Sequence, residues 1–438
     1  MSQKPSIGSR DPSDDAMLHQ LQKETFAYFL HESNLENGLV RDKTKKDWPA
    51  SIAATGLALA SYPIGVERSF LTRDDAIKRT LATLRFFSHS PQGTQANATG
   101  YRGFYYHFLD MKTGRRAWKC ELSTIDSAFL LAGALTAAMY FDRDTRNERE
   151  VRELADALYR RADWRWAQDK GLTVSQGWKP EIGFLKYRWE GYDEALLLYV
   201  FGLGSPTHPL MGDSYRAWST TYKWTKMYDT EFLYAGPLFI HQLSHIWLDF
   251  RGIQDDFMQK KGIDYFENSR RATLVQQRYA IRNPRRFSHY GEHCWGITAS
   301  DGPGPATRRV AGIRRKFFDY VSRGAPHGPD DGTIAPWAVV ASLPFAPEIV
   351  LPTIRYFDAL RLREKNPYGF KGTFNPTYPE KGRRPCGWTT PWHFGLNQGP
   401  IVMMIENYRT GFLWRLMRHC SYVIKGLRRA GFRNGWLS

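Results

Sequence analysis

Helix-like apolar runs recur through almost the whole chain, and they restrict it to a mainly helical fold. Two of them are STIDSAFLLAGALTAAMYF at residues 123–141 and GPIVMMIENYRTGFLWRLMRH at residues 399–419. Roughly ten to twelve such runs follow one another, and the strand-like segments between them are brief. There is no alternation of strands with helices, no Gly-rich phosphate loop and no internal repeat of fixed period. These patterns predict one large domain of packed helices.

The predicted architecture is a single (α/α)6 barrel, or toroid, over residues 16–438, with short β-hairpins in the loops at its cavity end. In a toroid of about twelve helices, the loops at one end build a cavity. That matches the polar and aromatic clusters found where the apolar runs end. The polar segment at residues 1–15, MSQKPSIGSRDPSDD, is predicted to be a disordered tail.

The chain is strongly basic, with 61 Lys and Arg against 44 Asp and Glu, a net charge of +17 and a pI of about 9.6. Such a positive net charge makes nucleic acid a candidate partner. The basic residues are scattered in short groups, however, and no zinc-finger, RRM or helix-turn-helix pattern accompanies them. We therefore expect a solvated basic surface and no nucleic-acid partner, while an anionic polysaccharide stays open.

Cysteine spacing and the N-terminus exclude several classes of protein. The four cysteines lie far apart without a CxxC pair, which excludes a zinc ribbon; they are Cys120, Cys294, Cys386 and Cys420. Two long-range disulfides and four free thiols both stay open. The N-terminus has no apolar core of a signal peptide, and no run of about 18 uncharged apolar residues predicts a transmembrane helix.

The stretch from Trp189 to Pro303 concentrates polar and aromatic side chains at the ends of apolar runs. They are Glu194, His208, Asp249, Arg251, Glu292, Trp295 and Asp301. A packed core explains the apolar runs but not this crowding. Aromatic residues make up 15% of the chain, and aromatic faces stack on sugar rings as well as filling cores. Aromatic side chains beside carboxylates favour a pocket for a neutral, polyhydroxylated ligand such as a sugar.

Eight blocks in one order resemble the bacterial glucoamylase-like family, over about Glu24 to Arg418. They are STIDSAFLLAGAL (123–135), GYDEALLLYVFGLGSPTHPL (191–210), GPLFIHQLSHIWLDFRG (236–252), NSRRA (268–272), YGEHCWGITASDGP (290–303), DGTIAPWAVVASLPFAPE (331–348), YGF (368–370) and QGPIVMMIENYRTG (398–411). This family includes the endo-β-1,2-glucanases of glycoside hydrolase family 144, and the transglycosylase region of cyclic β-1,2-glucan synthases is related.

The resemblance implies an (α/α)6 barrel and an inverting hydrolase of β-1,2-glucan, endo-acting or a close exo-acting relative. The expected substrate is a β-glucan oligo- or polysaccharide, which is cyclic or anionically substituted in some cases, and the chain is expected to be a monomer without a cofactor or a membrane partner. A periplasmic or secreted location is implied if a signal has been removed, and a cytoplasmic one otherwise. The alternatives are a retaining transglycosylase of the same fold and a non-catalytic protein that binds glycan or nucleic acid.

Glycoside hydrolysis needs two carboxyl groups, and three candidates carry them here. Glu194 follows Trp189 and Tyr192 at the start of an apolar helix, and the family's GY-x-E pattern makes it the expected acid. A first-turn Glu stabilised by the helix dipole is the structural alternative. Asp126, which also fits a capping box with Ser123, is the expected base or water-positioning partner, and Glu292 is its rival.

Further residues are expected to bind the sugar. The expected platforms and polar contacts are Trp189, Tyr192, His208, Arg251, Trp295, Asp301, Trp388 and Trp392. Arg251 alternatively pairs with Asp249 at the cavity floor. His241 and His245 are spaced like one face of a zinc site, but HQLSH lacks the Glu of HExxH, so no metal is expected.

Overall fold

The computed structural model describes residues 11–380 and 386–438. Helix α1 (Pro12–His31) begins directly after Asp11, whose carboxylate accepts a hydrogen bond from the Ser13 amide and caps the helix. The tail predicted over residues 1–15 is therefore wrong for residues 12–15, which form the first turn of α1. Residues 1–10 lie outside the described residues.

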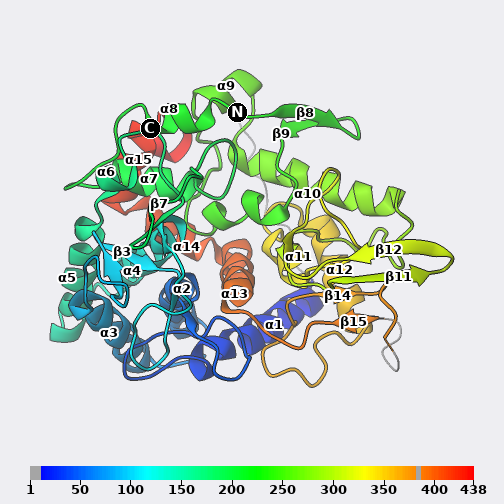
Figure 1. Cartoon of the computed structure of the whole chain (residues 1–438), viewed down its shortest axis with the longest axis horizontal. Coiled ribbons are helices and arrows are strands. Elements are labelled where there is room, and N and C mark those ends of the chain that lie inside the picture. The colour runs from blue at the N-terminus through cyan, green and yellow to red at the C-terminus, as the bar shows by residue number, and fades with distance from the viewer. Residues whose placement is uncertain (1–10, 381–385) are drawn as a thin grey trace.

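Six helical segments form an inner ring. In chain order they are α2 (Ile52–Glu67), α4 (Thr124–Tyr140), α7 (Leu196–Gly204), the 3-10 pair η1 (Leu238–His241) and η2 (Leu243–Ile246), α11 (Pro336–Ala341) and α13 (Gly395–Thr410). Each packs on or hydrogen-bonds to the next, and α13 returns to α2. Figure 1 shows α13 and α2 side by side near the middle of the molecule. The ring is therefore closed.

Six further helices cover this ring from outside. They are α1, α3 (Arg73–His89), α5 (Arg146–Arg161), α10 (Tyr265–Arg282), α12 (Pro347–Ala359) and α15 (Ser421–Arg429). The outer helices α3, α5 and α15 pack on the inner α2, α4 and α7 in turn, and α10, α12 and α1 cover the rest. The predicted mainly α architecture is confirmed, and its two layers follow the (α/α)6 pattern. The shorter helices are α6 (Trp164–Ala167), α8 (Ser214–Ser219), α9 (Asp256–Lys261), α14 (Phe412–Arg418) and η3 (Gly435–Leu437).

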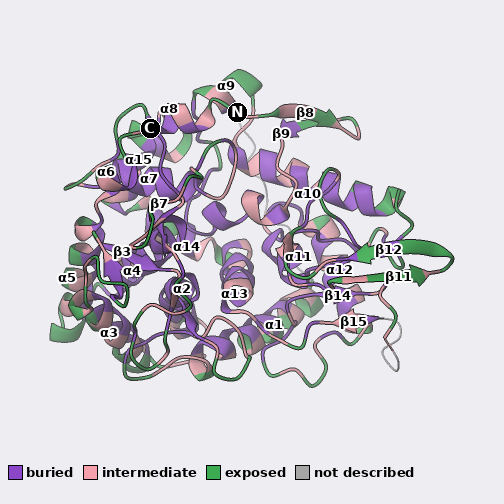
Figure 2. Ribbon diagram, in the orientation of Figure 1, coloured by how far each residue is buried: buried purple, intermediate pink, exposed green. Residues whose placement is uncertain are grey.

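Burial separates the two layers. Nearly every residue of α2 and α4 is buried, including residues on all faces of both helices. Their backbones approach closely at Gly56 and Gly133, where a Cβ atom on Gly133 would lie 2.0 Å from the Gly56 carbonyl oxygen. The outer helix α5 buries one face only, which is the pattern of an amphipathic surface helix. Figure 2 shows the buried residues concentrated in the inner helices.

The strands are short and lie in the connections. They are β1 (Ala50–Ser51), β2 (Gly100–Tyr101), β3 (Phe104–Tyr106), β4 (Phe108–Leu109), β5 (Leu122–Ser123), β6 (Gly177–Lys179), β7 (Gly183–Phe184), β8 (Trp224–Met227), β9 (Thr230–Leu233), β10 (Ala299–Ser300), β11 (Ala306–Val310), β12 (Ile313–Phe317), β13 (Val321–Ser322), β14 (Phe374–Asn375) and β15 (Trp388–Thr389). The largest sheet has the antiparallel order β2-β3-β5-β6-β7, with Leu122 opposite Trp178. Because β1 and β5 run directly into α2 and α4, the strands form the entrance to two inner helices.

The four cysteines are free thiols, which settles the alternative that the sequence left open. Within residues 11–380 and 386–438, every helix is too short or too polar to cross a membrane.

Candidate active site

A cavity of about 560 Å³ opens at the N-terminal ends of the inner segments. Asp126 lies in the first turn of α4, Glu194 just before α7, Phe239 in η1, Trp337 in α11 and Asn397 in the first turn of α13. A volume of this size lies within the range of roughly 300–1,000 Å³ typical of small-ligand sites. The closed ring thus brings together side chains from distant parts of the sequence.

Glu194 faces this cavity from the segment that leads into α7. The helix begins at Leu196, so Glu194 precedes it, and the structural alternative of a Glu in the first helical turn is wrong. Ser244 of η2 holds the segment, because its hydroxyl donates to the Glu194 carbonyl at 3.2 Å and accepts from the Leu197 amide at 3.0 Å. Burial and then the neighbouring Asp193 and Asp126 raise the pKa of the Glu194 carboxyl well above its usual range. Glu194 is therefore suited to donate a proton.

Asp193 points to the opposite side of the same segment. Its carboxylate accepts hydrogen bonds from the Ala195 amide at 2.9 Å and from the Trp218 indole at 3.1 Å. Burial also raises the pKa of Asp193. This carboxyl belongs to the packing around α7, and it is absent from the cavity wall.

Asp126 faces the cavity from α4 and caps that helix with Ser123. The Ser123 hydroxyl accepts from the Asp126 amide at 3.2 Å and donates to the Asp126 carboxylate. The predicted N-cap at Ser123 is confirmed, and the hydrogen bond from the Ser123 hydroxyl holds the carboxylate in place. His107 lies beside it, with Nε2 3.7 Å from Asp126 Oδ2. Capping and exposure to the cavity are therefore compatible roles for this residue.

His107 bridges two acidic groups at the cavity wall. Its Nδ1 lies 2.8 Å from Glu121 Oε1, while its Nε2 faces Asp126. Burial alone would lower the pKa of His107, but the charge of Asp126 and the hydrogen bond to Glu121 outweigh it and raise the pKa to about 9. At neutral pH an imidazolium therefore places a positive charge next to Asp126.

Two further acidic side chains, those of Asp42 and Asp301, line the cavity. Burial raises the pKa of both Asp42 and Asp301, and each carboxylate also feels the charge of Lys43. Lys43 Nζ lies 3.9 Å from Asp301 Oδ2. Tyr320 also lines the cavity, and it is 67% exposed. These groups supply the hydrogen-bond donors and acceptors that a polyhydroxylated ligand needs.

A buried arginine holds the loop that carries Asp301 and Tyr320. Arg323 and Asp331 are both fully buried and form a two-pronged ion pair with both N–O distances at 2.8 Å. The remaining Arg323 donors reach the carbonyl oxygens of Ser300, Phe318 and Asp319. Because β10 and β13 pair on either side of this cluster, Arg323 fixes the position of the loop between them.

Replacing Arg323 with Met should lower the free energy of unfolding by about 3–5 kcal/mol, because the Asp331 carboxylate keeps its buried charge but loses its ionic partner. Denaturant unfolding followed by circular dichroism measures this change. Arg160→Met is the matched control, since Arg160 forms an exposed pair with Asp156, and its effect should be far smaller. Equal effects of the two substitutions would contradict the role assigned to Arg323.

The cavity contains four of the residues expected from the sequence: Glu194, Asp126, Trp189 and Asp301. Trp189 is fixed by its indole N–H, which donates to Thr124 Oγ1 at 3.0 Å. The other seven lie elsewhere.

Three of those seven lie away from the cavity on polar surfaces. The side chain of Glu292 is 71% exposed, and its carbonyl accepts from Gln277 on the outer helix α10, so it cannot partner Glu194. His208 is exposed in the loop after α7, and Arg251 follows η2, both at the C-terminal ends of inner segments. Arg251 does pair with Asp249, as its structural alternative proposed, but in a separate hollow near Trp414.

The four remaining aromatic residues pack behind the cavity wall or beside it. Tyr192 lies between His241 and Tyr265 in the core. Trp295 is fully buried, and its indole donates to Thr353 of the outer helix α12. Trp388 in β15 and Trp392 are half-buried in the loop before α13, outside the cavity wall. Tyr192 and Trp295 therefore pack in the core, while the sugar contacts expected of Trp388 and Trp392 stay predictions.

His241 and His245 are both buried core residues. They lie in the 3-10 pair η1–η2, so the α-helical i, i+4 face assumed from the sequence does not form. His241 Nε2 lies 3.2 Å from the Ala235 carbonyl, and His245 Nε2 lies 2.9 Å from the Ser269 hydroxyl. Burial lowers the pKa of His241 to about 4 and that of His245 to about 3, so both stay neutral at physiological pH.

Several polar residues of the cavity wall were not predicted from the sequence. They are Asp42, Lys43, His107, Glu121, Gln176, Tyr320 and Asn397. Most of them lie in the connections that lead into inner helices. The charged residues in the segments that precede α2 and α4 could have indicated the site. Using that indication requires knowing which helices form the inner ring.

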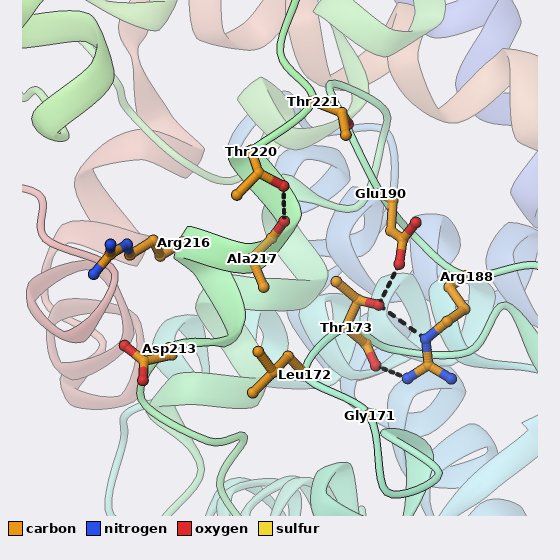
Figure 3. Close-up of a pocket in the computed structure, with 10 residues that line it drawn as sticks. All are labelled: Gly171, Leu172, Thr173, Arg188, Glu190, Asp213, Arg216, Ala217, Thr220 and Thr221. Atoms are coloured by element: carbon orange, nitrogen blue, oxygen red, sulfur yellow. Dashed lines mark hydrogen bonds between the residues drawn. The ribbon is translucent and has the colours of Figure 1, made fainter.

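A second hollow, of about 640 Å³, is lined by Arg188 and Glu190, the two residues on either side of Trp189. Figure 3 shows that Arg188, Thr173 and Glu190 form a chain within it: Thr173 Oγ1 donates to Glu190 at 2.8 Å and accepts from Arg188 Nε at 2.9 Å. This chain fixes the residues on both sides of Trp189. These hydrogen bonds therefore help to position Trp189 in the wall of the cavity.

Comparison with known proteins gives consistent matches over nearly the whole chain. The Glycoamylase family model, described as "Putative glucoamylase", matches residues 186–421, slightly more than half of the chain. A crystal structure of a putative glucoamylase from Bacteroides uniformis is 32% identical, with a TM-score of 0.86, covering 98% of this chain and 100% of that one.

Two further relatives are longer than this chain. It is 26% identical over 464 residues to an exo beta-1,2-glucooligosaccharide sophorohydrolase (non-reducing end) of Parabacteroides distasonis, which covers 98% of this chain but only 59% of that protein. A crystal structure of a beta-1,2-glucanase from Parabacteroides distasonis is 25% identical, with a TM-score of 0.82, covering 95% of this chain and 60% of that one. The chain thus spans about three fifths of these relatives.

Proposed function

The chain belongs to the Glycoamylase family, and from this premise we propose that it is a glycoside hydrolase that cleaves β-1,2-linked glucan or its oligosaccharides. The names of two relatives, a sophorohydrolase and a β-1,2-glucanase, support this linkage. The observation that carries the hydrolase proposal is the cavity itself, where Glu194 and Asp126 project from neighbouring inner segments. The chain acts in this proposal as a monomer, without a membrane partner or nucleic acid.

The two carboxyl groups have different roles in the proposed mechanism. Glu194, whose pKa is raised, protonates the glycosidic oxygen of the leaving sugar. Asp126, fixed by Ser123 and flanked by the His107 imidazolium, takes a proton from the attacking water. Attack from the face opposite the leaving group inverts the configuration at the anomeric carbon. Trp189 supplies an apolar wall for the sugar, and Asp42 and Asp301 accept hydrogen bonds from its hydroxyl groups.

A product profile tests the proposal. Linear and cyclic β-1,2-glucans should release reducing sugar, whereas β-1,3-glucan and starch should stay intact. Because the substrate has the β configuration, NMR of the first product should show the α-anomer. Cleavage of starch alone would overturn the linkage, and the β-anomer as first product would identify a retaining enzyme. Sophorose as the sole product would indicate exo action, whereas mixed oligosaccharides would indicate endo action.

A further inference from the structure

Trp118 is an exposed tryptophan beside the cavity, on the turn between β4 and β5. It is 56% exposed, which is unusual for so large an apolar side chain. Both Trp118 and Lys119 have positive φ values, 54° and 50°. Non-glycine residues seldom adopt this conformation, and those that do often lie in turns or at functional sites. The turn thus presents Trp118 to solvent at some cost in backbone energy.

A row of rings connects Trp118 with the catalytic carboxylate. The Trp118 ring lies 5.2 Å from Phe108, and Phe108 stacks on His107 at 4.0 Å with an interplanar angle of 12°. Phe108 and His107 line the cavity, and His107 lies 3.7 Å from Asp126. The row therefore runs continuously from the molecular surface to the carboxylate expected to activate water.

Trp48 fixes this platform from a second side. Its ring meets Trp118 edge-on at 4.6 Å, and its indole N–H donates to Asp42 Oδ2 in the cavity at 3.0 Å. Lys43 and Lys45 lie over the Trp48 ring at 4.3 Å and 4.5 Å. These contacts hold Trp48 in one orientation, so Trp118 is supported on two sides while the rest of its ring is open to solvent.

We propose that Trp118, supported by Trp48 and Phe108, forms an outer sugar-binding platform that holds a glucan chain where it extends beyond the cavity. The apolar face of a pyranose ring stacks on an indole, and the lysines beside Trp48 supply donors to its hydroxyl groups. This inference rests on the proposed glucan hydrolase function. It makes Trp118 a determinant of preference for long substrates, with no part in bond cleavage.

Trp118→Ala should lower the ratio of kcat/KM on long linear β-1,2-glucan to kcat/KM on the trisaccharide by about tenfold, the loss of one aromatic stacking contact. Trp118→Phe should recover part of the ratio because it keeps an aromatic face. Trp224→Ala is the matched control: Trp224 is a half-buried tryptophan on β8, with Lys261 Nζ 4.8 Å from its ring centroid. That control should leave the ratio at the wild-type value.

If Trp118→Ala has the wild-type ratio, whether or not activity falls equally on both substrates, the proposed platform is wrong. A wild-type protein that cleaves no glucan would instead refute the proposed function. In that case the intrinsic tryptophan fluorescence of the wild type and of Trp118→Ala, titrated with linear β-1,2-glucan, still tests the platform. Weaker binding by the variant supports it, and equal binding overturns it.

Discussion

Replacing Glu194 with Gln is expected to lower kcat on β-1,2-glucan by about 10²–10⁴-fold, the usual contribution of a general acid. The amide has the shape of the carboxyl but has no acidic proton for the leaving oxygen. Burial raises the pKa of Glu194, so the wild-type group is protonated and neutral over more of the pH range than an ordinary Glu. The substitution therefore leaves charge and packing nearly unchanged, and the melting temperature and oligosaccharide affinity should stay close to wild type.

Glu292→Gln is the matched control, because Glu292 was the rival carboxylate and lies outside the cavity. Its activity should equal that of the wild type. The pH profile gives a second measurement. Since Glu194 acts in its protonated form, wild-type kcat should fall as the pH rises through the raised pKa. Near wild-type turnover in Glu194→Gln, or a large loss in Glu292→Gln, would refute the assignment.

Replacing Asp126 with Asn is expected to lower kcat by a similar factor, about 10²–10⁴-fold, because the amide cannot accept the proton of the attacking water. The variant should also lower the pKa of His107 below its value of about 9, since the charge of Asp126 is one of the causes that raise it. NMR titration of the His107 imidazole measures that shift. A kcat near wild type would show that another carboxylate activates the water.

Asp75→Asn separates the catalytic from the capping role. Asp75 lies in the first turn of α3, where Thr72 accepts from its amide at 3.1 Å and donates to its carboxylate at 2.8 Å. This is the same capping arrangement as Ser123 and Asp126, on an exposed outer helix. Both Asn variants should lose a similar small amount of stability, but only Asp126→Asn should lose activity. Loss of activity in both would point to an indirect effect through folding.

The helical fold was readable from the sequence because it depends on local patterns. The uninterrupted apolar runs of α2 and α4 indicate helices buried on all sides, and such helices require an outer layer to cover them. The capping box at Ser123 and Asp126 was likewise readable, since its partners are three residues apart. Local signals of this kind also identified Glu194 and Trp189 as unusual residues at the start of an apolar helix.

These local patterns do not show which end of each inner helix faces the ligand. His208 and Arg251 have the same polar surroundings in the sequence as Glu194, yet they follow inner segments, and the cavity lies where inner segments begin. Glu292 and Trp295 belong to a conspicuous block, but the chain there contacts the outer helices α10 and α12. Assignment to the inner or outer layer depends on contacts between helices distant in sequence.

The pattern of residues along the chain predicted the mainly helical fold and two catalytic candidates, Glu194 and Asp126, because helix formation and capping depend on neighbouring residues. Which residues belong to the site depends instead on how the helices pack. Closure of the ring brings Asp42 and His107 to Asp126, and it sends Arg251 to the other end of the molecule. The raised pKa values of His107 and Glu194 arise from the same closure, since charge and burial act through space.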